Sequence, residues 1–424
     1  MMDSFTISRR AKADEISLIC NISHDPNAIT TTSRFPLLFR IRLAFENENV
    51  KRLSFRFQPV SFPMSDDTNY MVQTIMEKLA ANKTLKSFRW NMDLSHELYL
   101  RQLTYTISTN VHLRELDLSG SSFGAIDDRL LRQFCYAVAA HPQLVSLSLA
   151  DCNLTGDQAR LVVERLDGCW LEKLNMRGNE LDPIRNQISK FIYAHPITDL
   201  DLSEGEFVGF SSGLSFIFYP AETSRALRKL WLEGCGIETL TFNLDIVNFL
   251  IHSQCRLEFL SVRNNKIDWL YEFFQKLPRM KTIRYLDFAN NSPTVSCYGL
   301  HDTILSNYSL GWINTGGFDF IQEAEFVIHR MDLNNAGIGL THDESIPISL
   351  WPIILARINF LLFRGFQNAQ YWKKFPRPKT IFKYDNWSPS KTYYFTNERR
   401  STTMFEMIRA SPPALFDLNR PWII

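Results

Sequence analysis

The sequence repeats a short pattern of apolar residues, and this repeat constrains the fold more than any other feature. Each clear copy is an eleven-residue string with apolar residues at positions 1, 4, 6 and 11 and with Asn, Cys or a small residue at position 9, except that Pro293 takes position 11 of the last. The clear copies begin at Leu113, Leu144, Leu171, Ile197, Leu227, Leu257 and Ile283, and weaker copies begin at Val50, Leu85 and Leu310. Successive copies start 26 to 35 residues apart. A period of this length, sustained along the chain, indicates an architecture of stacked repeats.

Each copy predicts one short strand that is followed by one helix. Positions 4 and 6 lie two residues apart, so Leu147 and Leu149 should point to the same face of a strand. Between copies, segments 127–141 and 268–277 carry apolar residues at helical spacing. A unit of this size cannot bury its apolar face alone, and a helix supplies the crossover that neighbouring parallel strands require. The sequence therefore predicts an α/β fold with a parallel sheet.

The repeat resembles the leucine-rich repeat family, and its long period resembles the ribonuclease-inhibitor-like subclass of that family. The resemblance covers residues 50–318. It implies a curved solenoid of about ten repeats, with the parallel sheet on the concave side and the helices outside. We expect residues 1–49 to form an N-terminal cap and residues 319–424 to form a helical C-terminal cap.

Position 9 carries polar residues and cysteines that a structural role explains. A buried side chain there can bond to backbone groups of neighbouring turns, which would otherwise go unpaired. A metal site at the cysteines is the alternative. Seven cysteines, an odd number without paired spacing, indicate reduced thiols and a cytoplasmic protein, with the nucleus as the alternative. The residues at position 9 are Asn179, Asn265, Asn291, Cys152 and Cys235.

The two ends of the chain lack a clear repeat. Residues 1–49 contain alternating stretches typical of strands, EISLICNI and FPLLFRIRLAF, which could cover the exposed first strand of the solenoid. In the C-terminal region, 323–337 and 347–363 have helical spacing, and both are expected to pack as a cap. Segment 372–401 is basic and rich in proline, and we interpret it as a solvated loop.

The C-terminal region also resembles a module of leucine-rich repeat proteins from diatoms and related algae. The resemblance rests on DLNNAG, IPISLWPIILAR and MFEMIRASPPALF, and the sequence departs from the module at Asn335, Ile338 and Ile358. The module implies architecture and lineage but no biochemical role. Within it, SLWPIILARI resembles the elongin-binding box of ubiquitin-ligase adaptors, except that Ile354 replaces the cysteine of the box.

No motif in the sequence points to catalysis, a cofactor or a metal. The nine histidines include no HExxH pair and no Cys/His cluster with zinc spacing. The phosphate-binding loop GxxxxGK[ST], the dinucleotide fingerprint GxGxxG and the nucleophile elbow GxSxG are missing as well. A formal net charge of +1 gives no global field toward nucleic acid. The longest apolar stretch, 348–363, contains Arg357 and Asn359, so we expect no membrane span.

The candidate binding residues lie at positions 3, 5, 7 and 8, whose side chains should point away from the core. Exposed aromatic side chains are costly unless they are used, and Trp and Tyr dominate interaction hot spots. Carboxylates on the same face could receive a basic peptide. Two alternatives stay open: the C-terminal region covers the aromatics, and Lys173, Arg177 and Lys229 neutralise the carboxylates. The candidates are the aromatics Trp231, Phe259, Tyr285 and Trp312 and the acids Asp199, Asp201, Glu204 and Glu233.

The sequence therefore predicts a monomeric, non-catalytic scaffold that binds a protein or peptide partner on the concave face. The first alternative is a substrate adaptor of a ubiquitin ligase that docks through its C-terminal helices. The second alternative is nucleic-acid binding through segment 372–401, whose aromatic residues could stack on bases.

Overall fold

The computed structural model of the 424-residue chain describes residues 16–22, 45, 50–57, 66–91, 94–124, 126–166, 168–205, 226–252, 255–268, 270–291, 307 and 309–314. The chain forms two compact units. The first consists of Met1–Asp268 and Asp287–Pro293, and the second consists of Trp269–Leu286 and Thr294–Ile424. The expected C-terminal cap, with its algal-like module, its elongin-box-like segment and its basic segment, lies outside the described residues. Most of the expected N-terminal cap lies outside them too.

The first unit is built on a parallel sheet whose strands follow one another in the order of the sequence. Each neighbouring pair from β1 to β9 is parallel. Position 4 of each repeat lines up across the sheet, so that Leu147 pairs with Leu174 and Leu174 pairs with Leu200. The strands are β1 (Ile16–Ile22), β2 (Val50–Phe57), β3 (Ser87–Asn91), β4 (Glu115–Asp117), β5 (Ser146–Ser148), β6 (Lys173–Asn175), β7 (Asp199–Asp201), β8 (Lys229–Trp231) and β9 (Phe259–Ser261). The parallel sheet expected from the repeat is confirmed, and β1 confirms a strand in EISLICNI.

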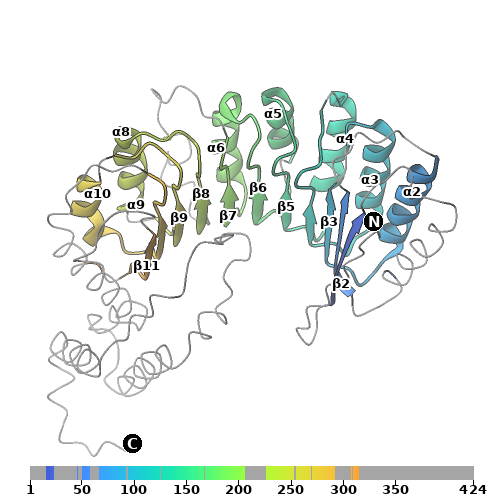
Figure 1. Ribbon diagram of the computed structural model, residues 1–424, viewed down its shortest axis with the longest axis horizontal. Helices are drawn as coiled ribbons and strands as arrows, with labels where there is room; N and C mark the ends of the chain where they lie inside the picture. The colour runs from blue at the N-terminus through green and yellow to red at the C-terminus, as the bar shows by residue number, and fades with distance from the viewer. Residues whose placement is uncertain are drawn as a thin grey trace, which may run out of the picture. The chain divides into compact units, whose positions relative to one another are not determined.

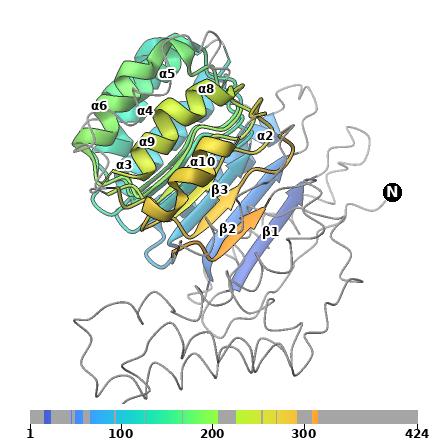
Figure 2. The same ribbon diagram turned by 90° about the vertical axis from the view of Figure 1, so that its left-hand side faces the viewer.

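The helices of the first unit lie on one face of this sheet (Figure 1). Seen from the side, they run next to one another above the strands (Figure 2). They are α2 (Asp66–Ala81), α3 (Glu97–Thr109), α4 (Asp128–Ala139), α5 (Gly156–Arg165), the 3₁₀ turn η1 (Asp182–Ile184), α6 (Arg185–Ala194) and the continuous run of α8 (Thr239–Thr241), the π-helical turn η3 (Phe242–Val247) and α9 (Asn248–Leu250). The helix expected within 127–141 is confirmed as α4.

The core lies between the helices and the sheet. Leu147 and Leu149, at positions 4 and 6, are buried, whereas Ser146 and Ser148, at positions 3 and 5, are half-buried. On α4 the side chains of Leu131, Phe134, Cys135 and Val138 are buried as well. Apolar residues two apart on the strand and three or four apart on the helix therefore meet in one layer, which is the arrangement that the two periods predict.

The side chains at position 9 bond to the backbone, as the sequence predicts. Asn265 Nδ2 donates to the carbonyl oxygens of Leu232 and Val262, at 2.8 and 2.7 Å. Its Oδ1 accepts from the Ile237 N–H at 2.9 Å. Asn179 and Asn291 make corresponding bonds, and the thiols of Cys152 and Cys235 donate to backbone carbonyls of the preceding repeat. The five cysteines whose side chains the structure describes are buried and form no disulfide: Cys135, Cys152, Cys169, Cys235 and Cys255.

A second set of side chains ties the turns that lead into the strands, and the sequence analysis did not anticipate it. Asn110 Nδ2 donates to the Leu79 and Asn82 carbonyls at 2.6 and 2.9 Å. Its Oδ1 accepts from the backbone N–H of Leu113 at 3.0 Å. His141 takes the same place one repeat later, where its Nε2 lies 2.5 Å from the Asn110 carbonyl oxygen. The signal in the sequence is an Asn or His three residues before the first apolar position, as in NKTL, NVHL, HPQL and NYSL.

The second unit is described over a shorter stretch. It holds α10 (Tyr271–Lys276), the 3₁₀ turn η4 (Leu277–Arg279), most of β10 (Tyr285–Asp287) and β11 (Trp312–Asn314). Asn307 repeats the turn-tying role within this unit, because its Nδ2 donates to the Leu277 and Met280 carbonyls at 2.7 and 3.0 Å. The weak copy that begins at Leu310 therefore does contain a strand.

Candidate functional site

The candidate site is the face of the first unit's sheet that points away from the described helices, which we call the helix-free face. Positions 3 and 5 of each repeat contribute its side chains. On β5 and β7 these positions are half-buried while the leucine between them is buried. The face is therefore a surface whose residue identities are not dictated by packing against the helices.

Ion pairs connect different strands near the start of this face. Arg52 of β2 lies 3.8 Å from Glu115 of β4, and Arg89 of β3 lies 3.3 Å from Asp117 of β4. On β5 the corresponding residues are uncharged, and Ser148 Oγ lies 2.8 Å from Ser119 Oγ. The sequence analysis did not find these pairs, although the partners occupy position 3 or position 5 of nearby repeats.

Around β7 the predicted acid Asp199 lies between two lysines. Its Oδ2 is 3.1 Å from Lys229 Nζ and 4.0 Å from Lys173 Nζ. The carboxylate side chain is only 16% exposed, whereas the two lysine side chains are 46% and 51% exposed. Asp199 is therefore not a free carboxylate, and the ammonium groups present the outer charge.

At the other end of the same strands, Arg177 lies between the predicted acids Glu204 and Glu233. Its guanidinium is 2.5 Å from Glu204 Oε1 and 3.6 Å from Glu233 Oε2. Burial acts to lower the pKa of Arg177, but the nearby carboxylates outweigh burial and raise it. Glu233 also accepts a hydrogen bond from Ser261 Oγ at 2.8 Å. Asp199, Glu204 and Glu233 are therefore each paired with a cation that the sequence named as a possible neutralising partner, although Glu204 and Glu233 share one guanidinium.

Asp201, the fourth predicted acid, forms a hydrogen bond to the backbone just after β7. Its Oδ1 accepts from the Ser203 N–H at 3.0 Å, and burial raises the pKa of its carboxyl group. The same turn recurs at position 5 of three other repeats, where Asp117, Asn175 and Asp287 each accept from the N–H two residues later. Such a side chain mimics a turn of the backbone, and a partner would find little of the Asp201 carboxylate to contact.

Two residues of the predicted aromatic row, Trp231 and Phe259, contact each other on the helix-free face of the first unit. The rings of Trp231 and Phe259 lie 5.0 Å apart between centroids. Trp231 is half-buried, and Phe259, whose ring it contacts, is only 6% exposed. The expectation that Phe259 presents a free ring therefore differs from the structure. Tyr285 lies in β10 and is 43% exposed, and Trp312 lies in β11 of the second unit.

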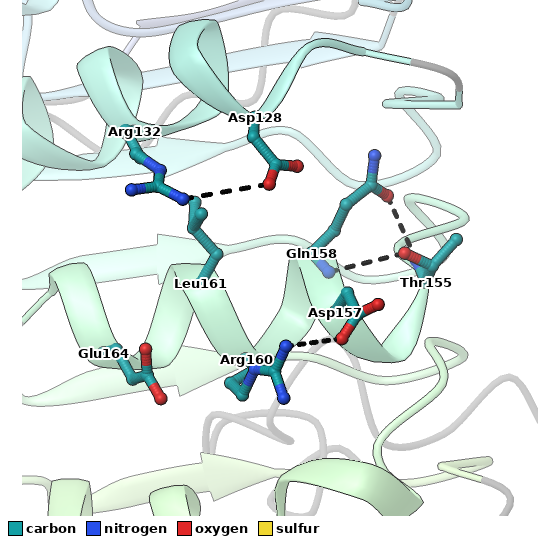
Figure 3. Close-up of a pocket in the computed structure, with 8 residues that line it drawn as sticks. All are labelled: Asp128, Arg132, Thr155, Asp157, Gln158, Arg160, Leu161 and Glu164. Carbon is teal, nitrogen blue, oxygen red and sulfur yellow. Dashed lines mark hydrogen bonds and ion pairs between the residues drawn. The ribbon is translucent and has the colours of Figure 1, made fainter.

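A shallow pocket of about 420 Å³ lies between α4 and α5, on the helical side (Figure 3). Its charges are used within each helix: Asp128 lies 3.9 Å from Arg132, and Asp157 lies 2.6 Å from Arg160. Thr155 and Gln158 form the capping box that begins α5. These are the ordinary contacts of helix surfaces, so this pocket does not compete with the helix-free face as a candidate site.

The described part of the chain shows neither a metal-binding cluster nor a helix that could span a membrane. Within it, no three His, Cys, Asp or Glu side chains are grouped so that they could hold a metal ion. Likewise, none of the helices described above has the length and apolar character that crossing a bilayer requires.

Comparison with known proteins gives distant structural likenesses only. No protein-family model matches the sequence, and no curated protein matches it. Among solved structures, leiomodin-1 actin-binding site 2 is similar with a TM-score of 0.27 and 15% identity, over 36% of this chain and 84% of that one. The TLR13–ssRNA13 complex is similar with a TM-score of 0.38 and 14% identity, over 64% of this chain and 40% of that one. Neither likeness assigns a function to this chain.

Proposed function

We propose that this protein is a non-catalytic scaffold of the leucine-rich repeat type that binds a protein partner on the helix-free face of its sheet. The observation that carries the proposal is the half-buried Trp231, whose ring contacts the packed Phe259 ring and which is flanked by the charged residues of β6–β8. A rigid aromatic side chain within a polar, charged rim is the usual composition of an interaction hot spot. The finer assignments, a ribonuclease-inhibitor-like subclass and a cytoplasmic location, belong to the same proposal.

The test compares two tryptophan variants in partner capture from the native cells. Trp231→Ala removes the proposed anchor, and Trp170→Ala removes a tryptophan that is 73% exposed in the turn before β6 and not on the helix-free face. Proteins that depend on the proposed site should be lost with Trp231→Ala and retained with Trp170→Ala. The melting temperature of each variant shows whether the fold survives the change.

The opposite result would contradict the proposal. If a reproducibly captured partner is retained by folded Trp231→Ala protein, the partner binds elsewhere. Catalytic turnover of a substrate by the purified chain would likewise contradict a scaffold.

A further inference from the structure

The charges on β6–β8 show a reciprocal pattern. At position 3, two lysines share one carboxylate, because Lys173 and Lys229 both approach Oδ2 of Asp199. At positions 7 and 8, two carboxylates share one guanidinium, because Glu204 and Glu233 both approach Arg177. Two lysines minus one aspartate leave one positive charge at position 3, and one arginine minus two glutamates leave one negative charge at positions 7 and 8.

This part of the face is therefore dipolar along the strand direction. Asp151 adds to the negative end, since its carboxyl group interacts with the charges of both Arg177 and Glu204. Trp231 occupies position 5 of β8, between Lys229 at position 3 and Glu233 at position 7. Positions 3 and 5 lie within β8, which is Lys229–Trp231, and position 7 lies in the turn that follows the strand. The side chains of Lys173, Lys229 and Glu204 are about half exposed, whereas that of Glu233 is only 16% exposed, so a partner meets mainly the two lysines and Glu204.

We propose that this face binds an extended segment of the partner that carries an acidic, an apolar and a basic side chain on alternate residues. Alternate side chains of an extended chain point to the same side with the spacing of positions 3 and 5, and position 7 follows in the turn beyond β8. The acidic residue would then lie over the lysines, the apolar residue against Trp231, and the basic residue over Glu204 and Glu233. The inference deepens the proposed function and depends on it.

Charge complementarity selects this partner over uniformly charged ones. A segment with only acidic residues would satisfy the lysines but meet like charge at Glu204 and Glu233. A segment with only basic residues would do the reverse at Lys173 and Lys229. Like charges at an interface suppress binding, so a dipolar segment is favoured over both. The segment can run in either direction, provided that its acidic end lies at position 3.

The experiment uses three synthetic peptides of equal length and the full chain. One carries Glu, Leu and Lys on alternate residues, one carries Glu at both charged places, and one carries Lys at both. Each is labelled with fluorescein, and its binding is followed by fluorescence polarisation up to about 1 mM protein, the range of weak peptide affinities. We expect the dipolar peptide to bind about fivefold more tightly than either of the others.

A matched pair of variants tests whether the preference for the dipolar peptide arises on this face. Lys173→Gln with Lys229→Gln removes the positive end, so the advantage of the dipolar peptide over the all-lysine peptide should disappear. Arg52→Gln removes a half-exposed cation from the β2–β4 region of the same face and should leave the advantage intact. If the double variant unfolds, Lys229→Gln alone serves the same purpose.

The outcomes separate this inference from the proposed function. Equal binding of the three peptides, binding of none, or an unchanged preference in the folded lysine variant would overturn the dipolar segment. If a native partner still depends on Trp231 in that case, the scaffold proposal stands without it. If neither Trp231→Ala nor the lysine variant changes the binding of any captured partner, both proposals fail.

Discussion

Single side chains hold the turns of this protein together, and Asn265 is the clearest example. It is buried and bonds to backbone groups of two repeats through both ends of its amide. Removing the amide leaves the carbonyl oxygens of Leu232 and Val262, two buried residues, without this hydrogen-bond donor. Such unsatisfied groups cost far more than the net gain from an average hydrogen bond.

We therefore expect Asn265→Ala to lower the free energy of unfolding by about 1–3 kcal/mol. Urea unfolding followed by circular dichroism measures the change. Asn186→Ala, at an exposed position of α6, is the matched control and should leave stability almost unchanged. A tolerated Asn265→Ala would show that water or a shifted turn replaces the amide.

His141 makes stability depend on pH. Burial lowers its pKa from the ordinary value of 6.5, more than the bond to the Asn110 carbonyl raises it. Above pH 6.5 both folded and unfolded chains hold the neutral imidazole, and its contribution to stability is complete. Below this value the unfolded chain binds the proton more readily, so stability falls as pH falls toward the lowered pKa of the folded state.

His141→Asn tests this expectation, because asparagine occupies the same place as Asn110 in the preceding repeat. Urea midpoints of the natural protein and the variant should diverge between pH 7.5 and pH 5.5, with the smaller loss in the variant. An identical pH dependence in the two proteins would assign the effect to other groups.

At the scale of elements, helix starts are fixed by local chemistry, and α5 shows this best. Thr155 Oγ1 accepts from the Gln158 N–H at 3.4 Å, while the Gln158 side chain accepts from the Thr155 N–H at 3.1 Å. These reciprocal bonds satisfy two donors that the first turn of a helix leaves open. Gln158 Nε2 also donates to the Gly124 carbonyl at 2.9 Å, so the cap of α5 is tied to the preceding repeat.

Thr155→Ala should therefore lower stability by about 1 kcal/mol, the usual value of an N-cap. Thr155→Ser keeps the hydroxyl group and should retain most of the stability. Differential scanning calorimetry of the three proteins measures the difference. Equal losses in both variants would mean that the methyl group, rather than the hydroxyl group, stabilises this turn.

At the scale of the whole molecule, each repeat buries its apolar residues against its neighbours. Leu174 is an example: it is buried at position 4 of β6, in register with Leu147 on one side and Leu200 on the other. In a stack of this kind stability is the sum of contributions from repeats and from the interfaces between neighbouring repeats. A cavity at Leu174 weakens two interfaces as well as its own repeat.

We expect Leu174→Ala to lower the free energy of unfolding by about 2–5 kcal/mol. The control is Leu240→Ala on α8, where the side chain is 68% exposed and little is lost on truncation. Hydrogen exchange measured by mass spectrometry should show faster exchange in β5, β6 and β7 of the Leu174 variant. Faster exchange confined to β6 would contradict coupling between repeats.

The sequence by itself determined the repeat, the parallel order of the strands, the helices between them and the backbone-bonding role of position 9. These features depend on contacts that recur with a fixed period. Examples are Leu147 and Leu149, which lie two residues apart and are both buried, and Asn265, which bonds to its own turn. Such a period can be recognised in a single amino-acid sequence. The asparagines before the strands, such as Asn110, obey the same logic, and their NxxL signal could have been found.

Only the tertiary structure decided how the exposed face is organised. Lys173, Asp199 and Lys229 are far apart in the sequence, and the register of three strands brings their charges onto one carboxylate. The contact between the Trp231 and Phe259 rings likewise joins residues that are one repeat apart. Side chains on this face are not constrained by the packing that creates the repeat pattern. Which of these side chains contact one another therefore depends on strand register and on side-chain rotamers, and the sequence pattern predicts neither.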